Sequence, residues 1–278
     1  KRTLGAAVLL MPVLSALELV QPVLLMWVVD GPVKDRDPAG VLPYALAFLA
    51  VLLLRFLAQF GHLYLVQKAG QQGTRDLRAE LFDHALSLRL SYFHKTPIGR
   101  LVTRLTTDIE SLNEMFAMGV VQIVGDLVTL TLVLVAMVAL SPKLSLVTLT
   151  VVPFVVAFVL LARVFLRAAF RNIRTWIARL NAYLAESISG MTVIQAFGRE
   201  PLSREEFDQI NRTYRDANFD SIRWDASLFA VVEALGAITI AGLLWVSAPA
   251  IVAGTASFGV LVAFTEYVKK FFVPIRDL

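Results

Sequence analysis

Long hydrophobic runs alternate with polar stretches along this chain, and their lengths point to membrane spans. An α-helix needs about 20 mainly apolar residues to cross a bilayer. Six runs approach or exceed that length, and they lie at residues 4–29, 41–66, 119–140, 144–166, 227–252 and 258–272. The first run is too long for the hydrophobic region of a signal peptide. We therefore expect an all-α membrane protein with six transmembrane helices, of which the last is short.

The polar stretches between these runs are of two kinds. Residues 67–118 and 167–226 form long connections, and the other connections are short. Apolar residues recur at helical spacing through both long connections, for example at Leu101, Leu105 and Ile109. We expect each long connection to be a pair of amphipathic helices that continue the spans. Solvated loops with some helix are the alternative.

Helix-breaking residues near the middle of each long connection predict a turn there. In the first connection Thr96 precedes Pro97, which is a favourable pair for an N-cap and a first helical turn. In the second connection the breakers are Gly198 and Pro201. Ser203 and Glu206 follow them with the spacing of a capping box, which predicts that a new helix starts at Ser203.

Lysine and arginine are concentrated on one side of the predicted membrane topology. The two long connections and the two termini carry 21 of these residues, whereas the short loops carry 3. Loops rich in lysine and arginine stay in the cytoplasm. We expect a multi-pass protein of the cell (inner) membrane with both termini and both long connections in the cytoplasm.

The composition supports this class and excludes several others. The chain of 278 residues is 57% hydrophobic and only 17% charged, whereas about a quarter of the residues in soluble domains are charged. The net charge of +4 follows the topology and forms no single basic block, so no nucleic-acid partner is expected. Cysteine is absent, and neither H-E-x-x-H nor G-x-S-x-G occurs. We expect no metal site and no catalytic site in this segment.

Ionisable and amide side chains within the spans are the main functional candidates. Glu18 and Arg55 lie at similar depths in antiparallel spans, near the bilayer midplane. A lipid-facing charge there costs about 2.5–3.5 kcal/mol, so we expect both to face protein or a cavity, where they can pair. Structural and substrate-binding roles both remain open. The candidate cavity residues are Glu18, Arg55, Gln59, Gln122, Asp126 and Glu233.

Four segments resemble the transmembrane domain of ABC exporters. The first is "DLRAELFDHALSLRLSYFHKTPIGRLVTRLTTDIESLNEMF" at residues 76–116, which is similar to the first intracellular arm of that family. The second is "ESISGMTVIQAFGREPLSREEFDQIN" at residues 186–211, which resembles the second arm. "LSPKLSLVTLTVVPFVV" at 140–156 and "SFGVLVAFTEYVKKFFVPIRDL" at 257–278 resemble the outer turn with the fourth helix and the sixth helix. The resemblance covers nearly the whole chain.

The resemblance implies a domain-swapped dimer of two such transmembrane domains, homomeric or heteromeric. The tips of the arms would be coupling helices, at about residues 92–99 and 196–206, which contact nucleotide-binding domains. The coupling residues implied in this way are Tyr92, Phe93, His94, Lys95, Thr96, Pro97, Gly99, Phe197, Gly198, Arg199 and Glu200.

An ATP-binding domain normally follows the sixth helix in this family, and no G-x-x-x-x-G-K-[ST] loop occurs in this chain. We expect the chain to be an excised transmembrane domain and the ATP-binding domain to follow residue 278. ATP and Mg would bind there, and the full-length protein would be an ABC-type ATPase and translocase. No cofactor is expected in the present segment.

The resemblance implies export of hydrophobic or amphipathic drugs, lipids or peptides by alternating access. The composition, rich in Ala, Leu, Val and Arg, resembles heterodimeric multidrug exporters of the TmrA/TmrB type. Two alternatives remain. One is a six-span receptor or regulatory domain whose arms bind a cytoplasmic partner. The other is an ion-coupled transporter that uses Glu18, Asp126 or Glu233 as proton sites.

Overall fold

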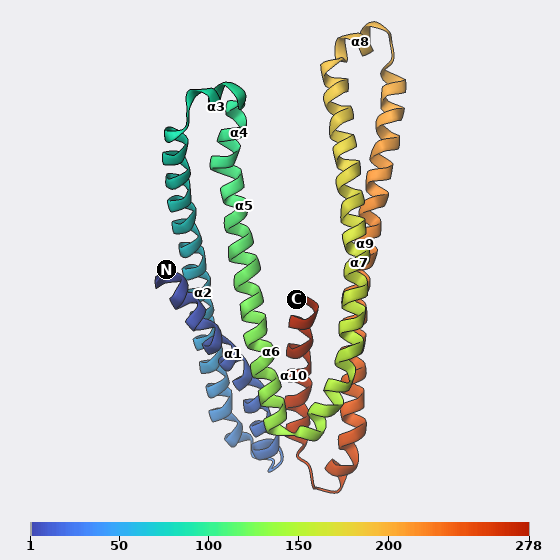
Figure 1. Ribbon diagram of the computed structural model, residues 1–278. Coiled ribbons are helices and arrows are strands. Elements are labelled where there is room, and N and C mark those ends of the chain that lie inside the picture. Colours follow the sequence, from blue (N-terminus) through green and yellow to red (C-terminus); the bar gives the residue numbers. More distant parts are fainter. Residues whose placement is uncertain (1, 278) are drawn as a thin grey trace. The chain divides into compact units, whose positions relative to one another are not determined.

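The computed structural model describes residues 2–277, including the side chains of residues 3–115 and 119–276. Every element within the described residues is helical, and η1, η2 and η3 are π-helical segments (Figure 1). In chain order the elements are α1 (Arg2–Val28), η1 (Val29–Val33), α2 (Pro38–Ser87), α3 (Leu90–Lys95), α4 (Ile98–Thr103), η2 (Arg104–Asp108), α5 (Ile109–Glu114), η3 (Met115–Val120), α6 (Val121–Leu140), α7 (Pro142–Ser189), α8 (Met191–Ala196), α9 (Glu200–Val252) and α10 (Phe258–Asp277).

Several helices continue from hydrophobic runs into polar arms, as the helical spacing predicts. The single helix α2, for example, holds the second hydrophobic run and the first leg of the first arm. Five helices of the described chain are long and apolar enough to cross a membrane, and they cover residues 3–33, 38–87, 121–140, 142–189 and 200–252. Helix α10 is not among them because Glu266, Lys269 and Lys270 lie within it. A sixth spanning helix therefore stays a prediction.

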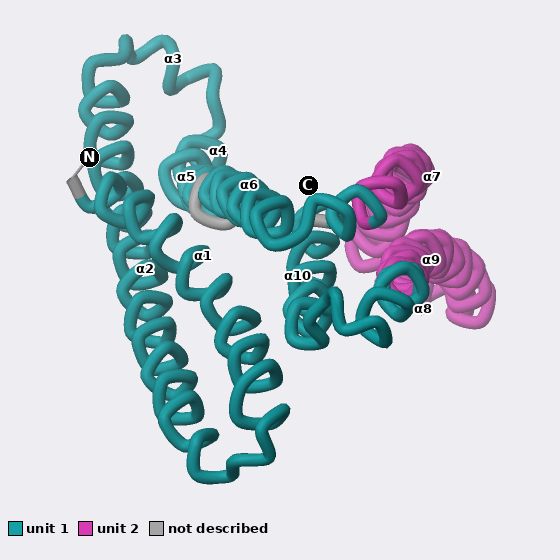
Figure 2. The backbone as a smooth tube through the Cα atoms, turned by 90° about the horizontal axis from the view of Figure 1, so that it is seen from below, with its two compact units in different colours: residues 1–147, 240–278 teal, residues 148–239 magenta. Residues whose placement is uncertain are grey.

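The chain divides into two units, which Figure 2 colours separately: residues 1–147 with 240–278, and residues 148–239. In the first unit α1 packs against α2, α6 and α10, and α10 also contacts α6. Helix α10 supplies much of the core of this unit in spite of its charges. Its buried side chains are Leu261, Ala263, Phe264, Tyr267, Val268, Phe271, Phe272 and Pro274.

The first arm belongs to the first unit, and its two legs pack closely. Helix α2 forms the outgoing leg, and α4, η2, α5 and η3 form the returning leg (Figure 1). The Arg78 Nε donates a hydrogen bond to the carbonyl oxygen of Leu105 at 3.0 Å. Gly70 on α2 lies against the side-chain amide of Asn113 on α5, which would have to shift to admit a Cβ there. These contacts give the arm a defined internal structure.

The second unit is the second arm together with the adjoining parts of α7 and α9. The rings of Phe165 on α7 and Trp224 on α9 stack with their centroids 4.2 Å apart. Nearer the tip, the Tyr183 hydroxyl lies 2.8 Å from the carbonyl oxygen of Ser203 and 3.1 Å from Glu206 Oε2. Aromatic packing and this polar contact therefore join the two legs at separate levels.

Asp30 in η1 fixes the start of α10 within the first unit. Its Oδ1 accepts a hydrogen bond from the Gly259 N–H at 2.9 Å, and its Oδ2 is bonded to the Ser257 hydroxyl. The Ser257 oxygen in turn accepts from the Val260 N–H at 3.2 Å. Two unpaired N–H groups of the first turn are thus satisfied, which is the general requirement at a helix N-terminus.

We expect Gly259→Ala to destabilise this junction. A Cβ at Gly259 would lie 2.5 Å from Asp30 Oδ2 and 2.5 Å from the Met26 carbonyl oxygen, so backbone as well as a side chain would have to move. Overpacking of this kind costs about 1–3 kcal/mol. The thermal unfolding midpoint of the detergent-solubilised protein should fall. The control is Gly5→Ala in α1, where no atom lies within 4 Å of the added Cβ; an unchanged midpoint for Gly259→Ala would contradict the collision.

Candidate functional site

A polar cavity lies within the first unit, among helices that are otherwise apolar. Its volume is about 480 Å³, and side chains of α1, α2, α6 and α10 line it. Met11, Leu14 and Leu63 contribute to its apolar walls. Its lining residues with polar or ionisable side chains are Ser15, Glu18, Gln59, His62, Gln67, Gln122, Asp126, Thr129 and Lys270.

Glu18 is the centre of an ion-pair network at this cavity. Its Oε1 lies 2.7 Å from Arg55 Nη2 and 3.3 Å from Lys270 Nζ. The side chain of Glu18 is 25% exposed and that of Lys270 is 18% exposed. One carboxylate therefore contacts two cations, so the three side chains together carry a net charge of +1. The expected pairing of Glu18 with Arg55 is present in the structure.

Lys270 is a member of this network that the sequence analysis did not identify. The positive-inside pattern treated it as one of the basic residues of the cytoplasmic face. In the structure Tyr267, one turn earlier on α10, donates its hydroxyl to the Leu19 carbonyl oxygen at 2.9 Å. This bond fixes α10 beside the Glu18 segment of α1, and the Lys270 ammonium then reaches the carboxylate. The helical spacing of the apolar residues in α10, which places Lys270 beside the buried face, is the sequence feature that could have predicted its place in the network.

A second polar group of the cavity comes from α6. The Gln122 Nε2 donates a hydrogen bond to Asp126 Oδ1 at 3.0 Å. These residues are four apart and so share one helix face. The pair Ser15 and Thr129, whose hydroxyl oxygens are 2.9 Å apart, joins α1 to the same helix.

The structure brings together most of the candidate cavity residues predicted from the sequence. Glu18, Gln59, Gln122 and Asp126 all line the cavity, and Arg55 contacts it through Glu18. The remaining candidate, Glu233, is exposed on α9 in the second unit and does not line the cavity. His62, which was not among the candidates, does line it, and its Nδ1 is 3.0 Å from the Ala7 carbonyl oxygen. Each of the four helices that line the cavity therefore contributes at least one polar side chain, which on α10 is Lys270.

The tip of the first arm differs slightly from its prediction. Tyr92, Phe93, His94 and Lys95 belong to the short helix α3, and Gly99 belongs to α4. Thr96 was expected to be an N-cap, and this is wrong. Thr96 ends α3, whereas Pro97 precedes α4 and accepts the Arg100 N–H at its carbonyl oxygen. The extended backbone that a residue before proline prefers makes Thr96 the link between the two helices.

The tip of the second arm differs more. The short helix there is α8, at Met191–Ala196, so it precedes most of the expected range 196–206. Phe197, Gly198 and Arg199 form the turn after it. Gly198 has φ +61°, the Arg199 N–H bonds to the Ile194 carbonyl, and the Gly198 N–H bonds to the Gln195 carbonyl. This pair of bonds is a Schellman motif, which ends a helix at a left-handed glycine.

The expected helix start at Ser203 is also wrong. Helix α9 begins at Glu200, with Pro201 in its first turn. The Ser203 N–H is already bonded to the Arg199 carbonyl oxygen, so it needs no cap. Glu206 contacts the Tyr183 hydroxyl of the opposite leg. Proline is favourable in a first turn because its missing N–H would have no helical partner there, and this preference places the start earlier than the capping box does.

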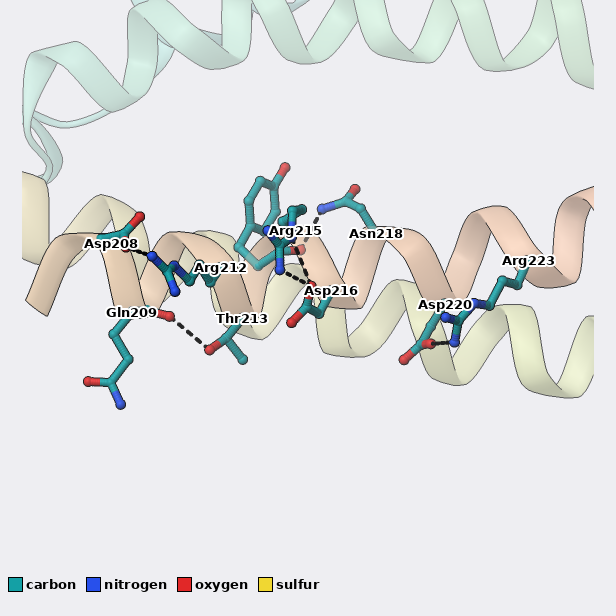
Figure 3. Close-up of polar contacts among 10 residues, drawn as sticks. Asp208, Gln209, Arg212, Thr213, Arg215, Asp216, Asn218, Asp220 and Arg223 are labelled. Atoms are coloured by element: carbon teal, nitrogen blue, oxygen red, sulfur yellow. Dashed lines mark hydrogen bonds and ion pairs between the residues drawn. The ribbon is translucent and has the colours of Figure 1, made fainter. Parts of the chain in front are cut away.

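Ion pairs follow the part of α9 that forms the returning leg of the second arm, as Figure 3 shows. Arg212 pairs with Asp208 at 2.7 Å, Arg215 with Asp216 at 2.7 Å and Arg223 with Asp220 at 3.4 Å. All six side chains are largely exposed, and exposed pairs of this kind add little stability. We infer that their main effect is to give this leg of the arm a surface suited to water.

Comparison with known proteins identifies the class. The family model of the ABC transporter transmembrane region matches residues 4–275, so the chain belongs to that family. It is 27% identical to the putative multidrug export ATP-binding/permease protein YgaD of Bacillus subtilis over its whole length, and 23% identical over 99% of it to the ATP-dependent lipid A-core flippase of Desulfotalea psychrophila. It is 30% identical over 89% of its length to a fatty acid ABC transporter ATP-binding/permease protein of Mycobacterium tuberculosis.

The chain spans less than half of each of these relatives. The matched shares are 49% of the Bacillus protein, 48% of the Desulfotalea protein and 39% of the Mycobacterium protein. The family assignment therefore applies to the membrane-embedded part.

Proposed function

We propose that this chain is the membrane-crossing part of an ATP-driven exporter whose polar cavity holds an amphipathic substrate. The observation that carries the proposal is the cavity in the first unit, in which the Glu18 network and the Gln122–Asp126 pair lie among apolar helices. Charged groups within a membrane protein typically mark a substrate or ion pathway. Apolar walls with a few polar groups are the general pattern of small-molecule sites.

The chemistry of the cavity favours substrates with an apolar body and a polar or zwitterionic group. Met11, Leu14 and Leu63 would contact the apolar body. Carboxylates and a lysine ammonium are both present, so groups of either charge could be held. The names of the relatives refer to multidrug export, a lipid A-core and fatty acids, which are compatible with amphipathic cargo.

Energy would reach the cavity through the arms. We propose that α10 forms a sixth span, that two such domains form a domain-swapped dimer, and that α3 and α8 with their adjoining turns contact nucleotide-binding domains. ATP and Mg²⁺ would bind in those domains, because the relatives are named as ATP-binding proteins. The lysine and arginine distribution supports cytoplasmic arms and termini in the cell (inner) membrane.

A cavity-filling variant tests the substrate site. Gly125 lines the cavity, and a Cβ there would meet no atom within 4 Å, so Gly125→Leu adds bulk without a backbone collision. In the full-length protein we expect an amphipathic compound that stimulates ATP hydrolysis to need at least a tenfold higher concentration in this variant, which corresponds to about 1.4 kcal/mol of binding free energy.

The matched control is Gly5→Leu, which also has open space around the added side chain. It should leave the half-maximal concentration within about twofold of the parent, since a surface change away from the cavity alters binding energy by only a few tenths of a kcal/mol. Equal half-maximal concentrations in the parent and in Gly125→Leu would overturn the assignment of the cavity as the substrate site.

A further inference from the structure

A second cavity in the first unit has a different chemistry from the polar one. Its volume is about 340 Å³, and it lies among α1, α2, α5, η3 and the start of α6. Its lining is almost entirely apolar or small and comprises Leu4, Val66, Ala69, Gly70, Gly73, Thr74, Leu77, Ile109, Leu112, Asn113, Val120 and Val121. Nothing in the mechanism proposed above uses this space.

Thr74 is the unusual member of this lining. The residue is only 8% exposed, and its Oγ1 has no hydrogen-bond partner among the described residues. Buried polar atoms in proteins are nearly always hydrogen-bonded, so an unpartnered one needs an explanation. A ligand group that hydrogen-bonds to this hydroxyl provides one.

The shape of the cavity restricts what could fill it. The lining residues on α2 run from Val66 to Leu77, which is about 16 Å along the helix at 1.5 Å per residue. A space of this length and of this small volume is narrow. An alkyl chain fits such a space better than a fused-ring compound does.

The position of the cavity determines which end of a bound molecule would face the bilayer and which would face the polar arm. Val66 and Val121 lie where hydrophobic runs end, whereas Thr74 and Leu77 lie on the polar arm. Arg78 follows Thr74 by four residues and therefore lies on the same face of α2, one turn farther along the arm. Its bond from Nε to the Leu105 carbonyl oxygen holds the guanidinium group there. An apolar tail would lie toward the bilayer, and an oxygen-bearing head would lie toward Thr74 and Arg78.

We propose that this cavity binds the alkyl tail of a single-chain amphiphile whose carboxylate or ester oxygen accepts a hydrogen bond from Thr74. The amphiphile could be a free fatty acid or a lysophospholipid of the inner leaflet, and both share this chemistry. The site is separate from the polar cavity, but Val66 and Val121 line both spaces. An occupant would therefore touch the wall of the polar cavity without entering it.

Tritiated decanoic acid, titrated into the full-length protein in nanodiscs, tests the proposal. Gly73 lines the apolar cavity and has no atom within 4 Å of an added Cβ, so Gly73→Leu should fill the space and weaken probe binding at least tenfold. Thr74→Val keeps the shape and removes the hydroxyl, and should weaken probe binding about three- to tenfold. Both variants should unfold at or above the temperature of the parent protein.

Two control variants separate this site from its surroundings. Thr106→Val removes a hydroxyl that is bonded to the Val102 carbonyl on the exposed returning leg, and should leave probe binding unchanged. Gly125→Leu fills the polar cavity and should also leave probe binding unchanged, so failure of the substrate site and failure of this site give different results. Probe binding that is unaffected by Gly73→Leu, or that is lost equally in Gly125→Leu, would overturn the proposal.

Two further measurements distinguish the sources of the amphiphile. Displacement of the probe by dodecanoate but not by lysophosphatidylglycerol supports a free fatty acid, and the reverse supports an inner-leaflet lipid. Native mass spectrometry of the parent protein and Gly73→Leu should show a bound single-chain amphiphile only in the parent. A parent protein that binds neither the probe nor any single-chain amphiphile contradicts the proposal.

Discussion

Replacing Phe197 with aspartate should leave the protein folded and abolish ATP-driven transport. Phe197 is 76% exposed in the turn after α8, and Val193, four residues earlier on α8, is 60% exposed. Clustered apolar side chains at the tip of a polar arm typically mark a contact surface for another protein. A carboxylate in such a contact would lose its hydration without gaining a partner.

We expect uptake into inverted vesicles to fall at least tenfold in Phe197→Asp, while the thermal unfolding midpoint stays within about 2 °C of the parent protein, because changes at exposed positions rarely exceed 0.5 kcal/mol. Phe197→Leu keeps an apolar side chain at the tip and should retain most of the transport. Normal uptake by Phe197→Asp would show that the second arm does not transmit energy through this turn.

Replacing Glu18 with glutamine should strongly destabilise the first unit. The change leaves Arg55 and Lys270 together without their shared carboxylate. An unpaired cation at the centre of a span costs about 2.5–3.5 kcal/mol on insertion scales. The thermal unfolding midpoint in detergent and the yield of monodisperse protein should both drop.

An exposed pair on the second arm provides the control. Arg212 Nη2 lies 2.7 Å from Asp208 Oδ2, and these side chains are 68% and 49% exposed. Asp208→Asn should therefore have little effect, as is usual for exposed pairs. If Glu18→Gln proves as mild as this control, the network around Glu18 contributes little to stability.

Neutralising the whole network decides between the two roles of Glu18. A triple variant with Glu18→Gln, Arg55→Gln and Lys270→Gln removes all three charges and should recover much of the lost stability, because no ion is left unpaired. Recovered folding together with lost transport would make Glu18 a substrate contact. Recovery of both would make the network structural.

The hydrophobic pattern was sufficient to predict the helical rods and part of the cavity. Spans and arms form continuous helices because the apolar spacing is helical on both sides of the membrane boundary, as α2 shows. The pairing of Glu18 with Arg55 followed from their similar depth in antiparallel spans. Both predictions depend only on how many residues separate two positions along a helix, and this number can be counted in the sequence.

Features that depend on contacts between distant segments could not be predicted in this way. Asp30 satisfies the start of α10 at Gly259, 229 residues later in the chain, and Lys270 reaches Glu18 only because Tyr267 is bonded to the Leu19 carbonyl. The start of α9 was misplaced because a capping box and a first-turn proline compete over a few residues. The π-helical segments η2 and η3 in the returning leg have the same apolar spacing as the α-helices beside them, so the pattern does not distinguish them.

The most direct measurement is ATP-dependent uptake of labelled amphipathic drugs, peptides and lipids into inverted membrane vesicles that contain the full-length protein. We expect at least one of these compounds to accumulate with ATP and not with a non-hydrolysable analogue, and Gly125→Leu to reduce that accumulation. Accumulation driven by a proton gradient without ATP, or the absence of ATP-dependent accumulation of every compound, would contradict the account.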